Sequence, residues 1–218
     1  MGELGRREKE KKIRRDDIID AAEKVIFSKG FELATMDEIS KEAEYSKRTV
    51  YMYFNSKEQL HFEIMIRGYK LMVQLLKSNL PKRNECDAVE RLKHFGKILY
   101  RFNLEYPDYF DAIMSYETGE KDFQTGVSDS SKEECYALGE QIFGYIVNIL
   151  KEGIEDHTVK SDLDVVSTAI ILWSATIGLF NVTIKKKNYI EQYHKKDSQE
   201  ILLEGLDMMI STIRRNEG

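Results

Sequence analysis

The sequence contains little of what sheets and irregular loops require. It has only two prolines among 218 residues, and no run of alternating apolar and polar residues is bounded by turn residues, so no sheet is expected. Leucine, isoleucine, lysine and glutamate, which tolerate or favour helices, are abundant. These features predict an all-α protein of about nine helices.

Cysteine and secretion signals are also scarce. Cys86 and Cys135 are too few and too far apart for a disulfide framework. The N-terminus is charged rather than apolar, so a secretory signal is not expected. Both features indicate a cytoplasmic protein.

The motifs of catalysis and metal binding are missing from the sequence. No His-Glu-x-x-His, glycine-rich phosphate loop or nucleophile elbow occurs. Four histidines are scattered without metal-ligand spacing: His61, His94, His157 and His194. A site gathered only by folding, for example from His94, Glu105 and Tyr109, has no support in the sequence. We therefore expect neither an enzyme nor a bound cofactor or metal.

One segment is long and uncharged. Residues 165–184 carry no charge over twenty positions, and three lysines follow, so by length this segment is long enough to span a membrane. Serine, threonine and asparagine interrupt it, which favours a helix buried on all sides in a soluble protein. A protomer of this size cannot easily bury such a helix alone, so no membrane but a partner surface is expected.

Residues 35–57 contain three helix-start signals within a short span. Thr35 with Glu38 and Ser56 with Gln59 have capping-box spacing, and Ser46 is a further N-cap. The pattern predicts a helix, a tight turn and two more helix starts. It is typical of a helix-turn-helix.

The helix that begins after Ser46 has one apolar face, formed by Val50 and Phe54. The cations, hydroxyls and tyrosines on its other faces are the groups that bind phosphates and base edges. Lys57 and Tyr53 are expected to hold phosphates, and Lys47, Arg48, Thr49 and Tyr51 to reach towards bases. The complete set of predicted DNA-binding residues is Thr35, Ser46, Lys47, Arg48, Thr49, Tyr51, Tyr53 and Lys57. The alternative is two amphipathic helices in a bundle that acts as an adaptor or ligand-binding protein without sequence-specific DNA binding.

This stretch resembles the N-terminal signature of TetR-type (TetR/AcrR) bacterial transcriptional regulators. The matching residues are Thr35-Met36-x-x-Ile39, Ala43, Ser46-Lys47-x-Thr49-Val50-Tyr51-x-Tyr53-Phe54 and Ser56-Lys57-Glu58-x-Leu60. The resemblance implies a three-helix DNA-binding domain and a larger C-terminal helical domain for ligand binding and dimerisation. It further implies a homodimer that binds a palindromic operator in double-stranded DNA and is released by a small-molecule effector. A repressor is expected, with an effector-dependent activator as the alternative.

Three positions depart from the family pattern. Glu44 stands in the turn where the family usually has glycine, and a positive φ there would cost about 1 kcal/mol. Met52 would make an apolar base contact, and Arg48 could bind guanine with both nitrogens. The operator sequence, the effector and the regulated genes are not encoded visibly in the chain.

Basic and acidic residues are unevenly distributed along the chain, whose net charge is −5. Residues 1–15 hold seven basic and three acidic residues, whereas 20 basic face 26 acidic residues beyond position 57. We predict a flexible basic arm at 1–13, a DNA-binding domain at 14–58 and an effector-binding and dimerisation domain at 59–218.

Helices are predicted at 16–29, with Gly30 as C-cap, and in the body at 86–105, 107–117, 131–156, 162–187 and 198–215. Pro107, Ser131 with Glu134, and Asp197 with Glu200 mark the starts of three of these, and 117–130 is predicted to be a surface loop.

The body is rich in aromatic residues, most of which must form core. As a set they could line an apolar cavity for a small, largely apolar or aromatic effector. The predicted ligand-binding residues are Phe95, Tyr100, Asn103, Tyr106, Phe110, Met114, Tyr136, Gln141, Tyr145, Trp173 and Thr176.

The last two predicted helices carry apolar residues at helical spacing and could form a four-helix bundle across a twofold axis. The predicted dimer residues are Trp173, Ile177, Gly178, Ile184, Leu202, Leu206, Met209 and Ile213.

Overall fold

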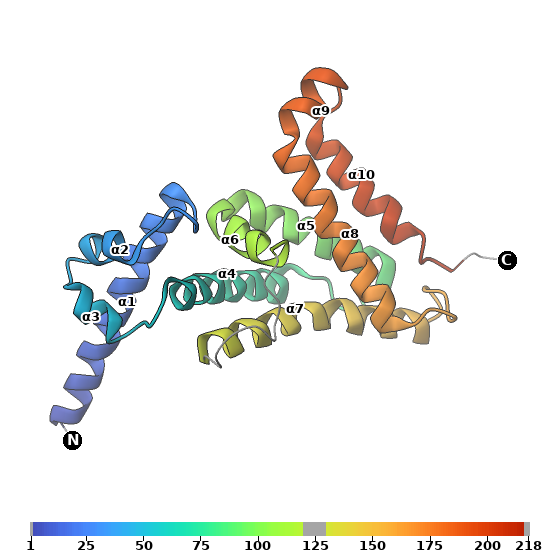
Figure 1. Cartoon of the computed structure of the whole chain (residues 1–218). Coiled ribbons are helices and arrows are strands. Elements are labelled where there is room, and N and C mark those ends of the chain that lie inside the picture. Colours follow the sequence, from blue (N-terminus) through green and yellow to red (C-terminus); the bar gives the residue numbers. More distant parts are fainter. Residues whose placement is uncertain (1, 120–129, 216–218) are drawn as a thin grey trace. The chain divides into compact units, whose positions relative to one another are not determined.

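The computed structural model describes residues 2–119 and 130–215, and every regular element in these two ranges is a helix (Figure 1). The all-α prediction is confirmed. The helices are α1 (Gly2–Lys29), α2 (Met36–Glu42), α3 (Lys47–Tyr51), α4 (Lys57–Asn79), α5 (Ala88–Glu105), α6 (Pro107–Glu117), α7 (Ser130–Glu155), α8 (Val165–Lys185), α9 (Lys187–Tyr193) and α10 (Ser198–Ser211).

Local capping signals located most helix starts. Thr35, Ser46 and Asp197 each cap the next helix through a side-chain oxygen, as predicted, and Pro107 begins α6. The short α9 was not predicted, because Lys186 caps it without a side-chain hydrogen bond. Residues 120–129 of the predicted loop lie outside the described residues.

The predicted capping box at Ser131 is wrong. Helix α7 begins one residue earlier, at Ser130, which places Ser131 inside the first turn. There its hydroxyl donates to the Glu63 carboxylate at 2.5 Å. Glu134 instead forms an ion pair with Lys70, 2.7 Å away.

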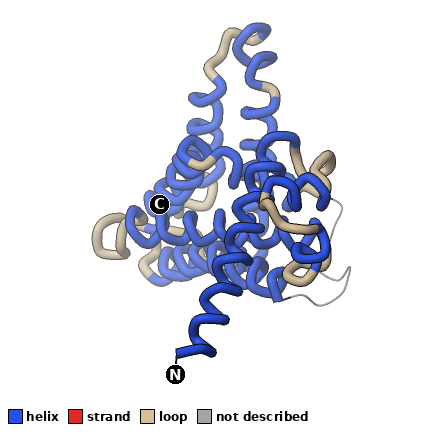
Figure 2. The backbone as a smooth tube through the Cα atoms, turned by 90° about the vertical axis from the view of Figure 1, so that its left-hand side faces the viewer, coloured by secondary structure: helices blue, strands red, loops and turns tan. Residues whose placement is uncertain are grey.

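Helix α1 is much longer than predicted. It runs through the basic segment as one helix of 28 residues, so neither its predicted start at Asp16 nor the predicted irregular arm agrees with the structure. The physical reason is that Lys, Arg and Glu are good helix formers and the packed part of the helix removes the nucleation cost. Figure 2 shows these first turns as helix. Gly30 ends α1 with φ +83°, as expected for a C-cap glycine.

The chain divides into two compact units that do not match the predicted boundary at residue 58. The N-terminal unit comprises residues 1–70 and 108–137, and the C-terminal unit comprises residues 71–107 and 138–218. The N-terminal unit therefore adds the beginning of α4, nearly all of α6 and the beginning of α7 to the three helices of the predicted DNA-binding domain.

In the C-terminal unit, α10 packs against α5 and α8. Leu206 lies against Gly96 of α5, and Leu179 of α8 lies against Gly205. Leu202, Leu206 and Ile213 are all buried in this packing. Their assignment to a dimer surface was wrong, because the protomer's own helices already cover them.

Helix α8 leaves much of its apolar surface uncovered. By length and composition it is the one helix in residues 2–119 and 130–215 that could cross a membrane, and only 17% of its most apolar window is buried. Its large exposed side chains are Val166, Ile170, Ile171, Val182 and Ile184. At 100° per residue these side chains spread over about 160° of the helix circumference, and an apolar surface of this extent needs a covering partner.

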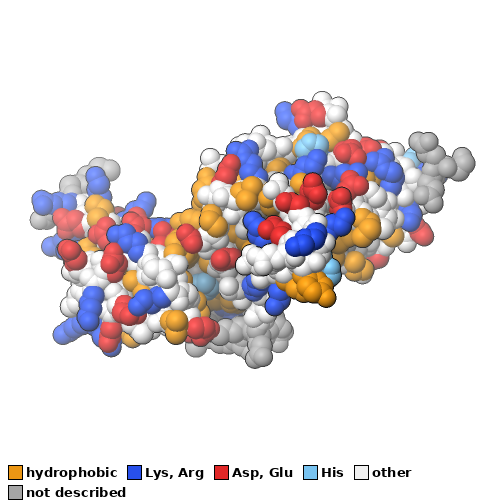
Figure 3. Space-filling model, turned by 90° about the horizontal axis from the view of Figure 1, so that it is seen from above, with side chains coloured by type: hydrophobic (Ala, Val, Ile, Leu, Met, Phe, Trp, Pro, Cys, Tyr) orange, Lys and Arg blue, Asp and Glu red, His pale blue; other side chains and the backbone are white. Residues whose placement is uncertain are grey.

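Ion pairs connect the helices of the C-terminal unit at its surface. They are Arg83–Glu155, Arg91–Glu152, Lys93–Asp207 and Arg214–Asp87. On the face presented in Figure 3, basic and acidic side chains are interspersed rather than segregated. These four cations of the unit are thus balanced locally.

The turn between α2 and α3 holds Glu44 at the position where the family pattern usually has glycine. Glu44 adopts φ +57°, a left-handed conformation that a non-glycine residue enters at a cost. The Tyr45 amide donates to the Ser40 carbonyl at 3.1 Å, which closes the turn. Glu44 thus carries the strain that was expected if this turn held a non-glycine residue at positive φ.

We expect Glu44→Gly to raise the free energy of unfolding by about 0.5 kcal/mol, because relief of the left-handed strain exceeds the added chain entropy. Lys41→Gly, in the last turn of α2 and exposed, should lower it by about 1 kcal/mol. Urea unfolding of both variants tests this. Equal destabilisation by the two glycines would show that the Glu44 turn is unstrained.

Gly153 is expected to tolerate no side chain. A Cβ there would lie 2.5 Å from Val159 Cγ2 and 2.6 Å from Ala88 Cβ, so Gly153→Ala should destabilise the protein by about 1–3 kcal/mol. Gly144, in the same helix, has open space around its Cβ position, and Gly144→Ala should stabilise by up to about 1 kcal/mol. Thermal unfolding that ranks the two alanines in the opposite order would contradict this packing.

Candidate nucleic-acid interface

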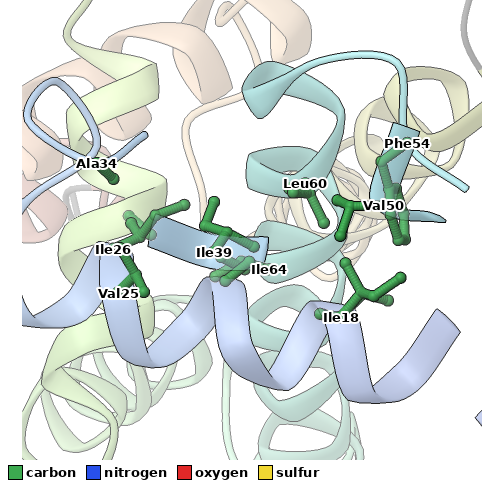
Figure 4. Packing of buried hydrophobic residues seen from close by; sticks show 12 residues of the cluster. Ile18, Val25, Ile26, Ala34, Ile39, Val50, Phe54, Leu60 and Ile64 are labelled. Carbon is green, nitrogen blue, oxygen red and sulfur yellow. The ribbon is translucent and has the colours of Figure 1, made fainter. Parts of the chain in front are cut away.

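A compact apolar core positions the helix-turn-helix. Val50 and Phe54 are buried at 0% and 1% exposure in a cluster with residues of α1, α2 and α4. In Figure 4, Ile18 of α1 lies beside Val50 and Phe54, and Ile39 of α2 lies nearer Val25 and Ile26. The apolar side of α3 and of the turn that follows it is thus fixed against this core, and the opposite face is left to solvent.

The start of α2 is fixed by a complete capping box. The Thr35 hydroxyl accepts from the Glu38 amide at 3.3 Å, and the Glu38 carboxylate accepts from the Thr35 amide at 3.1 Å. Lys29 of α1 binds the same carboxylate at 2.6 Å. Hydrogen bonds from Lys29 and Thr35 lower the pKa of Glu38, so the box is ionised at neutral pH and weakens only on acidification.

The start of α3 uses the same chemistry. Ser46 Oγ accepts from the Thr49 amide at 3.1 Å and shares a hydrogen bond with Thr49 Oγ1 at 2.8 Å. The predicted DNA-binding hydroxyls Thr35, Ser46 and Thr49 are therefore all engaged in helix capping, which orients the two helices. Their contact with DNA stays a prediction.

The exposed face of α3 and its C-terminal end present a cation, a phenol and an apolar chain. Arg48 is exposed and forms no ion pair with any residue of the described ranges. Tyr51 and Met52 are 42% and 76% exposed. Tyr53 is half-buried against the core. A guanidinium with no competing carboxylate is free to bind a phosphate or the edge of a guanine.

Two predicted DNA contacts are engaged within the protein. Lys47 forms an ion pair with Asp37 of α2 at 2.5 Å, and this carboxylate raises the pKa of the lysine. The Lys57 ammonium donates to the carbonyls of Phe31 and Glu32 at 2.5 and 3.2 Å. Either lysine would have to exchange these partners for phosphate, so both roles stay predictions.

A buried ionic contact, which the sequence did not indicate, ties α1 to α4. Arg15 lies 2.5 Å from Glu63, whose side chain is 8% exposed, and Ser131 donates to the same carboxylate. The Arg15 guanidinium also lies 5.3 Å from the centre of the Phe54 ring. One arginine thus joins α1, α4 and the residue that anchors α3.

A second contact of this kind lies further along α1. Arg67 of α4 binds Asp20 at 2.6 Å and Glu23 at 2.9 Å. Tyr109 of α6 donates to Glu23 at 2.8 Å and packs edge-on against Phe27. Burial, followed by the hydrogen bond to Glu23, raises the pKa of Tyr109 and keeps its hydroxyl a donor. No sequence motif marks these pairs, because their partners are distant in the chain.

The predicted ligand-binding residues are divided between the two units. Phe110, Met114 and Tyr136 belong to the N-terminal unit, where the Tyr136 and Tyr116 hydroxyls are 2.9 Å apart. The others belong to the C-terminal unit, where Tyr100 lies near Phe180 with ring centroids 6.5 Å apart. Phe95 and Phe110 are buried core, and Gln141 is exposed. The effector site therefore stays a prediction.

Residues 18–64 match the family model of the bacterial regulatory proteins of the tetR family. Over a longer stretch, the chain is 27% identical across 165 residues to the fatty acid metabolism regulator protein of Bacillus subtilis (strain 168). That alignment covers 72% of this chain and 76% of the Bacillus protein. The helix-turn-helix lies within residues 18–64.

Two solved structures share the fold. A tetR-family transcription regulator from Shewanella sp. PV-4 superimposes with a TM-score of 0.67 at 13% identity, covering 93% of this chain and 99% of that one. The transcriptional regulator FadR from Bacillus subtilis, solved in complex with stearoyl-CoA, gives a TM-score of 0.64 at 19% identity, covering 90% and 98%. The N-terminal segment thus carries the tetR family signature, and the chain shares the fold of these solved regulators.

Proposed function

We propose that this protein is a transcriptional repressor that binds a palindromic operator as a homodimer and is released by a small-molecule effector. The observation that carries the proposal is the outer face of α3, where Arg48 is exposed without an ionic partner among the described residues and Tyr51 is exposed beside it. Val50 fixes the direction of this face by its burial. A rigid short helix with such side chains suits the major groove of DNA.

The proposed homodimer is supported by α8. Its exposed apolar surface, formed by Val166, Ile170, Ile171, Val182 and Ile184, is large for a surface helix, and a second copy of the same helix would bury a part of it by twofold symmetry. Of the residues predicted from the sequence, Ile184, Trp173, Ile177 and Gly178 keep some exposure. Two reading helices related by this symmetry would recognise the two halves of a palindrome. DNA is in the cytoplasm of bacteria, so we place the protein there.

We further propose an acyl-CoA thioester as the effector class. The support is the names of two relatives: one regulates fatty acid metabolism, and one was solved in complex with stearoyl-CoA. The aromatic and methionine-rich body is compatible with an acyl chain, because such side chains favour apolar ligands. The effector would lower DNA affinity by no more than the ratio of its own affinities for the two conformations, the one that cannot bind DNA and the one that can.

Arg48→Ala is expected to weaken binding to the selected operator by about 1–3 kcal/mol and to relax the preference at one base pair in each half-site, because a paired contact to guanine is lost. The operator is obtained by selecting duplexes from a random pool with the purified protein. Affinity is then measured for that operator, for single-base variants and for a scrambled duplex.

Arg101→Ala is the matched control, since it also removes one exposed guanidinium but lies on α5. It should leave operator affinity unchanged. Sedimentation of the wild-type complex should give two protomers for each duplex. Equal affinity of the wild type for operator and scrambled DNA at every salt concentration would refute the proposed function.

Stearoyl-CoA is expected to reduce operator affinity by about 5–150-fold, the range typical of coupling between two sites. Operator DNA should reduce stearoyl-CoA affinity by the same factor, because the coupling is reciprocal. Coenzyme A alone and stearate alone are the controls. Thermal stabilisation by coenzyme A alone, with no response of operator binding to stearoyl-CoA, would exclude the acyl-CoA effector and leave the DNA-binding proposal untouched.

A further inference from the structure

The first turns of α1 form a helix that contacts little of the protein. Every residue from Gly5 to Arg14 is exposed, and the first buried side chain of α1 is that of Ile18. In Figures 1 and 2 this part of α1 projects from the N-terminal unit as bare helix. Ten residues of helix are about 15 Å long. A projection of this length with no apolar side has no evident role in folding the domain.

The cations of this segment are not arranged at random around the helix. Arg7, Lys11 and Arg14 continue, at the same spacing, the buried positions Ile18, Ala22 and Val25. The six positions fall within about 80° of one another around the helix axis. One face of α1 is therefore apolar where it packs on α2 and α3 and cationic where it extends beyond them.

This cationic stripe, Arg7, Lys11 and Arg14, begins at the end of the core that holds α3. Ile18 lies beside Val50 in Figure 4. Tyr45, in the turn before α3, donates to Asp17 of α1 at 2.9 Å. The stripe therefore leaves the domain on the side of the reading helix and on the helix face that α3 packs against.

The stripe lacks carboxylate partners in contact. None of its three side chains forms an ion pair with a residue in 5–119 or 130–215. Several other cations of the domain are paired: Arg6 with Glu10, Arg15 with Glu63, Lys24 with Glu42, Lys29 with Glu38 and Lys47 with Asp37. Lys9 and Lys12, on the opposite face of the same helical segment, are unpaired within those ranges as well, so the stripe is distinguished by the face on which it lies. Three unpaired cations in a row on one face form a local positive surface in a protein of net charge −5.

We propose that the stripe of Arg7, Lys11 and Arg14 binds phosphates of the DNA that flanks the base pairs contacted by α3, and so lengthens the operator of each protomer. The proposal rests on the proposed function, since α3 must first bring the duplex to this side of the domain. Contacts to phosphates give affinity and register but do not read bases. The flanking DNA is thus required as duplex of sufficient length, whatever its sequence.

The test compares two variants with equal loss of charge. Arg7→Gln, Lys11→Gln and Arg14→Gln together remove the stripe. Arg6→Gln, Lys9→Gln and Lys12→Gln together remove three cations from the opposite face of the same helical segment. Operator affinity is measured against salt concentration, on a duplex trimmed to the selected operator and on one extended by about one helical turn at each end.

The stripe variant should lose about 2.7 units per protomer from the slope of log affinity against log salt, about 0.9 for each phosphate contact. A fourfold rise in salt should therefore weaken the wild type about 40-fold more, per protomer, than the variant. The wild type should prefer the extended duplex, and the stripe variant should bind both duplexes equally. The opposite-face variant should keep most of the slope and the preference for length, and thermal unfolding should be the same for all three proteins because these residues are exposed.

Equal effects of the two variants would overturn the proposal, because the segment would then act only through its total charge. A second outcome would also overturn it. The wild type would bind its operator specifically, the stripe variant would show the same slope of log affinity against log salt, and neither protein would prefer the longer duplex. That outcome would leave the proposed function intact. Failure of the wild type to bind any sequence specifically would overturn both.

Discussion

The direction of α3 depends on the burial of two side chains. A helix of five residues is too short to be stable in water, so α3 exists because Val50 and Phe54 are packed against α1 and α4. Its two ends are fixed by Ser46 and by the return of the chain into α4. The contacts proposed between α3 and DNA are made by side chains that this packing turns outward, Arg48 first among them. Loss of this core would therefore unfold α3 and remove its exposed face altogether.

An ionic contact at Glu63 connects this core to the first turn of α7, which is also part of the N-terminal unit. Glu63 is a carboxylate removed from solvent, and a buried charge is tolerated only with a close counter-charge and hydrogen bonds. Arg15 supplies the charge and Ser131, in the first turn of α7, supplies a hydrogen bond. A shift of α4 or of the start of α7 therefore cannot leave α1 unaffected. If an effector acts as proposed, these contacts would connect movement of α4 or of the start of α7 to the helix-turn-helix.

Helix caps could be predicted from the sequence, but the partner against which each helix face packs could not. Caps such as Thr35 and Asp197 act within three residues, so their spacing alone located helix starts. Helical periodicity identified the apolar face of α10, but only packing decides that Leu206 faces its own protomer. Charge composition cannot distinguish a basic helix continuous with α1 from a disordered arm. For the candidate site, sequence indicated which residues of α3 point outward, but not that carbonyl oxygens already hold Lys57.

Pairing of charges resolves the conflict between an acidic protein and a DNA-binding function. Lys24, Lys29 and Lys47 around the helix-turn-helix are neutralised by carboxylates in contact, so they contribute little to the field that a duplex meets. The acidic excess lies beyond residue 57, where 26 acidic residues face 20 basic ones. Such a body repels phosphate in any approach except one that meets the unpaired cations first. Under the proposed function, the net charge of −5 would disfavour non-specific binding, and the exposed cations on α3 and α1 would favour one orientation of the duplex.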